Sequence, residues 1–201
     1  MLTYLNNSTT VVIVLHEIYG INEHIIDTCE RLSQAGVDVL CPDMLGNRKS
    51  FSYEQEDKAY SFFMNQIGFE MAFSQIRNLI NDIKGRYKAV CAVGYSAGAT
   101  VAWLCSGEKG LCDAAIGFYG SRIRDHLEVE PKCPVLLFFP SQEKSFNVHH
   151  LTSILTKKEN VQVKTYTGKH GFADPYSKNY CPKSTDHAGQ DMTTLVNTLP
   201  S

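Results

Sequence analysis

A serine stands between two glycines in G-Y-S-A-G at positions 94–98, directly after the apolar run Ala89–Val93 and before a helix-like segment. This G-x-S-x-G pattern is typical of a nucleophile elbow, a sharp strand-to-helix turn that exposes the serine hydroxyl. The serine would lie at a helix N-terminus, where backbone N–H groups stabilise negative charge. The alternative is a glycine-rich turn whose serine has no chemical role. The pattern and its context predict Ser96 as a nucleophile.

A serine nucleophile needs a base within hydrogen-bond reach, and that base needs an acid to orient it. In chains with this elbow, the order along the sequence is nucleophile, acid, histidine. His170 directly follows the last apolar run and stands close to Gly168 and Gly171, which is typical of a sharply bent loop. His187 lies in a polar stretch and is more typical of a surface residue. We therefore expect His170 to be the base.

The acid is expected after the apolar run Val135–Phe139, where Glu143 is the first carboxylate. A glutamate can fix the imidazole tautomer and stabilise its charged form as an aspartate does. The alternative is a solvated loop carboxylate beside Lys144. Asp174 is a second candidate for the acid, but it is so close in sequence to His170 that its carboxylate would have difficulty reaching behind the ring.

Glu17 comes directly after the first apolar run of the chain. A carboxylate at the mouth of a sheet is costly to desolvate unless it has a partner, so such residues are candidates for functional sites. It can equally be a buried acceptor that holds loops together. Both interpretations of Glu17 stay open.

Six short apolar runs rich in β-branched residues alternate with helical patterns, and each run is flanked by polar or Gly/Pro residues. The runs are Val11–Leu15, Val37–Leu40, Ala89–Val93, Ala114–Tyr119, Val135–Phe139 and Val161–Tyr166. This alternation predicts an α/β fold with a mostly parallel sheet and helices on both faces, in one domain over residues 1–201. Only about ten residues precede the first run, so we expect no N-terminal edge strand or hairpin. Ligands of such a sheet bind at the carboxyl ends of its strands.

Several motifs together resemble the dienelactone hydrolase family of α/β-hydrolases. They are L-H-E-I-Y-G at 15–20, P-D-M-L-G at 42–46, the elbow at 94–98, F-Y-G at 118–120 and H-G-F at 170–172, which span most of the chain. The resemblance implies a nucleophile, acid and base at Ser96, Glu143 and His170. It also implies an oxyanion hole made by the backbone N–H groups of Ile18 and Ala97, and an acidic group at Glu17 that can contact the nucleophile in the resting enzyme.

The chain departs from the family at three places. Members that cleave dienelactone use a cysteine nucleophile, whereas this chain has Ser96. They carry arginines for the substrate carboxylate, one of them four residues after the catalytic histidine, where this chain has Asp174. Family members usually have G-x-x-D where this chain has P-S-Q-E at 140–143. Because a carboxylate repels an anionic substrate, a neutral ester is the better expectation.

The composition favours small molecules as partners. A chain of 201 residues with a net charge of −2 has no general attraction for nucleic acid or an anionic membrane. It has no apolar run long enough to span a bilayer and no secretory signal pattern, which predicts a cytoplasmic location. Its seven cysteines include no C-x-x-C pair and read as reduced packing residues. We expect no metal and no cofactor, and a monomer or weak homodimer.

These patterns predict a serine hydrolase that cleaves a small ester through an acyl-enzyme. The alternatives are an acyltransferase or thioesterase on the same residues, or a binding protein whose triad has decayed. The pocket walls are expected from residues 47–68, with Phe62, Phe63 and Tyr119 as candidate aromatic linings or core residues. Arg48 and Lys49 are candidates for contacting a polar substrate, or part of a solvated loop.

Overall fold

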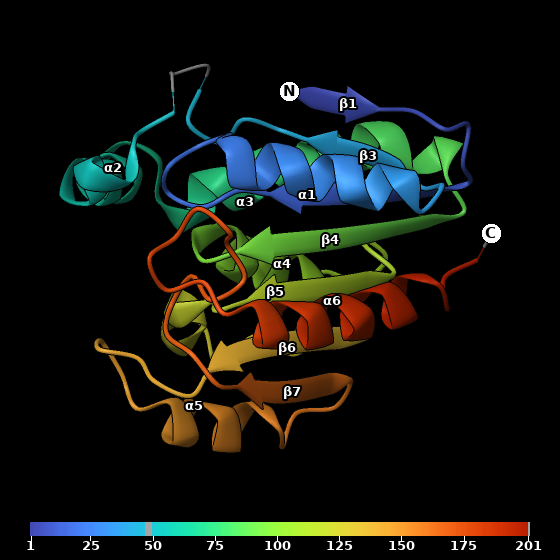
Figure 1. Cartoon of the computed structure of the whole chain (residues 1–201). Coiled ribbons are helices and arrows are strands. Elements are labelled where there is room, and N and C mark those ends of the chain that lie inside the picture. Colours follow the sequence, from blue (N-terminus) through green and yellow to red (C-terminus); the bar gives the residue numbers. More distant parts are fainter. Residues whose placement is uncertain (47–49, 201) are drawn as a thin grey trace.

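The computed structural model describes residues 1–46 and 50–200, so Arg48 and Lys49 lie outside the described residues. In this part of the chain, a seven-stranded sheet has the strand order β1-β3-β2-β4-β5-β6-β7 (Figure 1). The strands are β1 (Leu2–Tyr4), β2 (Thr10–Leu15), β3 (Asp38–Cys41), β4 (Ala89–Tyr95), β5 (Ala114–Phe118), β6 (Val135–Pro140) and β7 (Val161–Tyr166). All neighbouring strands are parallel except β1 and β3. The predicted α/β-hydrolase fold is confirmed.

The expectation of no N-terminal edge strand was wrong. Strand β1 pairs antiparallel with β3, with Leu2 opposite Cys41 and Tyr4 opposite Val39. Leu2 and Tyr4 are half-buried against the core, while the residue between them is exposed. A strand of three residues presents only two inward side chains, which is too short a pattern to recognise in the sequence.

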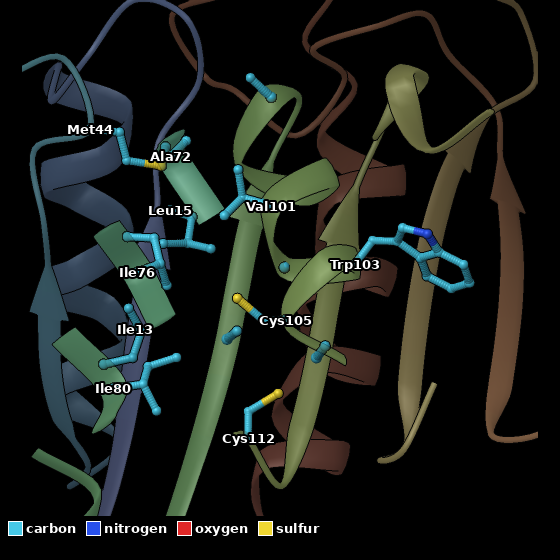
Figure 2. Packing of buried hydrophobic residues seen from close by; sticks show 14 of the residues in the cluster. Ile13, Leu15, Met44, Ala72, Ile76, Ile80, Val101, Trp103, Cys105 and Cys112 are labelled. Atoms are coloured by element: carbon cyan, nitrogen blue, oxygen red, sulfur yellow. The ribbon is translucent and has the colours of Figure 1, made fainter. Parts of the chain in front are cut away.

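Helices cover both faces of the sheet and leave strands β2 to β6 buried, whereas the edge strands β1 and β7 are half-buried or exposed. The longer ones are α1 (Glu23–Gln34), α2 (Glu56–Phe62), α3 (Gly68–Ile83), α4 (Ala97–Ser106), α5 (Val148–Leu155) and α6 (Pro182–Val196). Side chains of α3, α4 and α5 pack with one set of strand residues, and those of α1 and α6 pack with the other set. Figure 2 shows the first layer, where Ile13 and Leu15 of β2 meet Ile76 and Ile80 of α3. Each such buried side chain contributes roughly 1.5–3 kcal/mol.

Residues 51–67 form a helical segment over the carboxyl end of the sheet, which the sequence did not reveal. A short 3-10 turn leads into α2, and a π-helical turn (Phe63–Ile67) follows and ends at Gly68, where φ is +69°. Phe63 is fully buried in the core, whereas Phe62 is half-buried and lies 5.8 Å from the Phe51 ring. The connections after β2, β4, β6 and β7 also lie at this end, on the left in Figure 1.

Candidate active site

Ser96 occupies a strained turn between the end of β4 and the start of α4. Its φ of +51° and ψ of −109° lie where an L-residue is disfavoured by about 1–3 kcal/mol. The two glycines are required by close packing. A Cβ at Gly94 would lie 2.1 Å from the Gly98 carbonyl oxygen, and a Cβ at Gly98 would lie 2.1 Å from the Leu15 carbonyl oxygen. The turn thus presents the Ser96 hydroxyl at the carboxyl end of the sheet.

His170 meets this hydroxyl from the loop that follows β7. Its Nε2 lies 2.9 Å from Ser96 Oγ, and the Asn179 side chain donates a hydrogen bond of 2.8 Å to the His170 carbonyl oxygen. The loop bends at Gly168 and Gly171, where φ is +143° and +82°. The Tyr119 ring packs 4.9 Å from the imidazole ring. The imidazole keeps 36% of its surface exposed, so a substrate has access to it.

Glu143 lies behind the imidazole, on the side away from the serine. Its Oε1 is 2.8 Å from His170 Nδ1, and its side chain is 5% exposed. The loop after β6 reaches this position because the Gln142 N–H donates to the Gly168 carbonyl oxygen at 3.1 Å. The extra methylene of glutamate is accommodated by this loop. The structure therefore brings the predicted nucleophile, base and acid into one hydrogen-bonded line.

The two alternative residues lie elsewhere. The Asp174 carboxylate accepts hydrogen bonds from the Tyr53 hydroxyl at 2.6 Å and from the Tyr176 N–H at 2.8 Å. Asp174 therefore contacts its own loop and the segment before α2. The position at His170 Nδ1, where the acid was expected, is occupied by Glu143. His187 is exposed on α6, with its ring 6.2 Å from the Tyr166 ring.

The charges around His170 favour its protonated form. Burial lowers the pKa of His170, but the hydrogen bond and charge of Glu143, together with the charge of Glu17, raise it, and the net pKa lies above the ordinary value. An imidazole that has taken a proton from Ser96 is therefore stabilised where it forms. This is the property that a general base next to a serine needs.

The expected oxyanion hole lies between the β2–α1 connection and the first turn of α4. Ala97 is the first residue of α4, so its N–H has no partner within the helix. Among residues 1–46 and 50–200, neither the Ile18 N–H nor the Ala97 N–H donates a hydrogen bond to another protein group. Both donors are therefore available to an incoming oxygen atom.

His16 fixes the connection that carries one of these donors, a role the sequence did not reveal. The Met44 N–H donates to His16 Nε2 at 2.9 Å, so the ring proton is on Nδ1, which lies 2.7 Å from the Glu17 carbonyl oxygen. The imidazole is fully buried. It joins the chain after β2 to the chain after β3. The only signal in the sequence was its place directly before Glu17.

Glu17 is buried beside these groups, with 4% of its surface exposed. Burial, followed by the charge of Asp174, raises the pKa of Glu17 to about 7, although His170 and the Tyr119 hydroxyl act in the opposite direction. The Tyr119 hydroxyl is buried and has no hydrogen bond of ordinary geometry to any described residue, although it lies close enough to Glu17 to affect that pKa. No hydrogen bond joins Glu17 to Ser96 within the described chain.

Two hollows lie along residues 51–66. One of about 230 Å³ is lined by Asn22, Glu23, Phe51, Ser52, Tyr53, Glu54 and Tyr176, and one of about 620 Å³ by Phe51, Gln55, Asp57, Lys58, Ser61, Phe62, Asn65 and Gln66. Neither includes Ser96 or His170. Tyr53 in the lining of the first donates a hydrogen bond to Asp174. Within the described ranges, no group of three or more His, Cys, Asp or Glu side chains is arranged to hold a metal ion. No helix in those ranges has the length and apolarity needed to span a bilayer.

The sequence profile of the dienelactone hydrolase family matches residues 2–199. The Bacillus subtilis (strain 168) protein YczH is 39% identical over 169 residues, which are 83% of this chain and 82% of that protein. Carboxymethylenebutenolidase 1 of Cupriavidus pinatubonensis (strain JMP 134) is 25% identical over 96% of this chain and 89% of its own length. A dienelactone hydrolase-like promiscuous phosphotriesterase from metagenomic libraries has a similar fold, with a TM-score of 0.77 and 15% identity over 98% of this chain and 96% of its own.

Proposed function

The chain belongs to the dienelactone hydrolase family, and we propose that it is a serine hydrolase that cleaves small, uncharged carboxylic esters. The observation that carries the proposal is the line of hydrogen bonds from Ser96 Oγ to His170 Nε2 and from His170 Nδ1 to Glu143. Nucleophile, base and acid need this order of contacts to work together. The cytoplasmic location and the monomeric or weakly dimeric state are part of the same proposal.

In the first half of the reaction, Ser96 Oγ attacks the ester carbonyl carbon while His170 Nε2 takes the hydroxyl proton. Glu143 stabilises the imidazolium, and the N–H groups of Ile18 and Ala97 bind the oxyanion. Each such donor contributes about 3 kcal/mol to the transition state in related chemistry. The bond between the carbonyl carbon and the alkoxide oxygen then breaks, and His170 gives its proton to that oxygen. The alcohol departs, and the acyl group stays on Ser96 Oγ.

In the second half, water replaces the alcohol. His170 removes a proton from the water as it attacks the acyl carbonyl carbon, and the same two N–H groups bind the second oxyanion. Collapse of this intermediate breaks the bond to Ser96 Oγ, which recovers its proton from His170. The carboxylic acid then leaves.

The charges near the site support an uncharged substrate. Asp174 stands where dienelactone-cleaving relatives carry an arginine, and it adds to the negative charge around Glu17. Glu17 and Asp174 are 4% and 1% exposed, and a substrate carboxylate that approached them would meet this negative charge. Neutral acyl chains and neutral leaving alcohols meet no such penalty.

The test uses the folded full-length chain, a fluorophosphonate probe and p-nitrophenyl acetate and butyrate. We expect the probe to label Ser96, as shown by peptide mapping, and the Ser96→Ala variant to lose both labelling and turnover. Absence of labelling at Ser96 in a sample that unfolds cooperatively would overturn the proposal. Faster turnover of acyl-CoA than of the simple esters would point to the thioesterase alternative. Acyl transfer to an added alcohol in preference to water would point to the acyltransferase alternative.

A further inference from the structure

We propose that Cys112 and Cys133 form a disulfide bond when the folded protein meets a hydroperoxide. The pair would then be an oxidative modification site at the end of the sheet opposite to the candidate catalytic residues. Its basis is the contact between the two sulfur atoms, which lie 3.7 Å apart. Both thiols are free in this structure.

The backbone holds the two cysteines at a separation that a disulfide accepts. Cys112 precedes β5 and Cys133 precedes β6, and the register pairs Ala115 with Val135. Extending that register places Cys133 opposite Asp113, one residue from Cys112. Strand spacing and rise then put the two Cα atoms about 6 Å apart, within the usual range for disulfides. The sulfur atoms need to approach by about 1.7 Å, since 3.7 Å exceeds a disulfide bond of about 2.0 Å by that amount.

The main chain on both sides of the pair is held in place. The Asp113 N–H donates to the Val90 carbonyl oxygen at 2.8 Å, and the Ala115 N–H donates to the Pro134 carbonyl oxygen at 3.0 Å. Side-chain rotation can therefore close the gap while the strands stay where they are.

Access separates this pair from the other cysteines. Cys112 and Cys133 are 6% and 7% exposed. Four other cysteines have no exposed surface: Cys29, Cys41, Cys91 and Cys105. Cys181 is half-buried, and its sulfur contacts the Ser184 hydroxyl. A small oxidant such as hydrogen peroxide suits two thiols that show only a little surface.

The contact also favours one sulfur as the first to react. Either thiol can donate in this contact; when Cys112 donates, the hydrogen bond stabilises the Cys133 thiolate and lowers the pKa of Cys133, although burial acts against this. The same bond and burial raise the pKa of Cys112. The Cys133 thiolate is therefore the favoured nucleophile, because thiolates and not thiols attack peroxides.

The reaction balances with one peroxide per disulfide. The Cys133 thiolate attacks one peroxide oxygen, the O–O bond breaks, and a sulfenic acid and hydroxide form. Cys112 sulfur then attacks the Cys133 sulfur, the S–O bond breaks, and the hydroxyl group leaves as water after taking up a proton. In sum, two thiols and hydrogen peroxide give one disulfide and two water molecules.

The cross-link should stabilise the fold and leave the candidate active site unchanged. It closes a loop that contains β5, which restricts the unfolded chain. The sulfurs lie before the amino ends of β5 and β6, whereas Ser96 and Glu143 follow the carboxyl ends of β4 and β6. Figure 2 shows Cys112 at the far end of the packed layer from Met44, which follows the carboxyl end of β3.

The experiment treats the reduced, folded full-length chain with hydrogen peroxide and follows intact mass, peptide maps and thermal unfolding. We expect a loss of about 2 Da, a peptide that joins Cys112 to Cys133, and a Tm higher by about 5–10 °C that a reductant reverses. The Cys112→Ser variant should lose the mass decrease and the Tm shift. The Cys105→Ser variant, which alters a neighbouring thiol with no exposed surface, should keep both.

Three results would overturn the proposal. One is oxidation that adds oxygen to single cysteines and leaves Cys112 and Cys133 unlinked. Another is a cross-link that forms only in denaturant, because the native contact would then play no part. The third is a cross-link that survives in Cys112→Ser. None of these readouts depends on ester turnover, so they are independent of the function proposed above.

Discussion

Replacement of Glu143 by glutamine removes a charge and leaves the shape of the site almost unchanged. The amide oxygen of glutamine can still accept the hydrogen bond from His170 Nδ1, so the ring keeps its tautomer and its orientation. What is lost is the attraction between the carboxylate and the imidazolium. That attraction exists only after the Ser96 proton has moved, so the loss falls on the transition state and the rate measures it.

The structure sets the size of this loss. Glu143 Oε1 and His170 Nδ1 are 2.8 Å apart, and the Glu143 side chain is 5% exposed, so water screens the pair poorly. Each charge is spread over its group, so we treat the pair as two unit charges about 4 Å apart, which attract each other by about 4 kcal/mol at an effective dielectric constant of about 20. The retained hydrogen bond offsets part of this, which leaves about 3–4 kcal/mol. We therefore expect kcat for a p-nitrophenyl ester to fall by about 10²–10³-fold.

The assay compares Glu143→Gln with a matched change at the surface. Glu128 contacts His126 Nδ1 at 3.8 Å and is 74% exposed, so Glu128→Gln also removes a carboxylate from a histidine and should leave turnover unchanged. Because the hydrogen bond and charge of Glu143 raise the pKa of His170 against the effect of burial, the acid limb of the pH–rate profile should move to lower pH in Glu143→Gln. A variant with a rate within threefold of the parent and an unmoved acid limb would refute the assignment of Glu143 as the acid.

Three further predictions follow from the same geometry. Burial lowers the pKa of His170, but Glu143 and Glu17 raise it to a net value above the ordinary one. Since only neutral imidazole accepts a proton, kcat/KM should rise with pH through a midpoint above about 6.5. A midpoint below about 6 would contradict this. Gly98→Ala places a Cβ 2.1 Å from a backbone oxygen and should lower the free energy of unfolding in urea by at least about 3 kcal/mol. In the control Gly189→Ala on α6, the Cβ meets no atom within 4 Å, and the free energy of unfolding should rise by about 0.5–1 kcal/mol. Burial, then the charge of Asp174, raises the pKa of Glu17 from 4.5 to about 7, so the folded state binds this proton more tightly than the unfolded state does. The parent therefore loses about 3 kcal/mol of free energy of unfolding as the pH rises from 4.5 to 7 and above. Glu17→Gln should therefore be the more stable protein at pH 8 and equal to the parent near pH 4, and equal stability at both pH values would exclude a shifted pKa.

Most of the fold could be predicted from the sequence, because parallel strands that are buried on both faces appear as continuous apolar runs. All six predicted runs are strands, and each observed boundary lies within two residues of the expected one. Helix α2 and the π-helical turn were missed because the segment has no apolar stripe of its own: Ala59 and Phe63 are its buried residues. The Phe63 ring lies 5.2 Å from the Phe69 ring of α3, a contact that only the tertiary structure sets.

The sequence predicted the residues of the candidate site only where they directly follow a predicted strand. Ser96, Glu143 and His170 each follow a strand, so the sheet alone predicts that they lie at one edge, and the structure adds the distances between them. Their catalytic roles stay predictions. His16 and Tyr53 could not have been found in this way, because their partners, Met44 and Asp174, lie 28 and 121 residues away along the chain.

The surroundings of Asp174 explain how this residue raises the pKa of Glu17. Asp174 is 1% exposed, and its hydrogen bonds come from a neutral hydroxyl and a backbone N–H. His24 lies 3.9 Å away, but burial lowers its pKa to about 4, so its ring carries no charge at pH 7 and gives Asp174 no counter-charge. The carboxylate therefore keeps its field, which raises the pKa of the neighbouring Glu17 and opposes anions. An arginine at position 174 would carry the opposite charge, so Asp174→Arg should lower the pKa of Glu17 where Asp174 raises it.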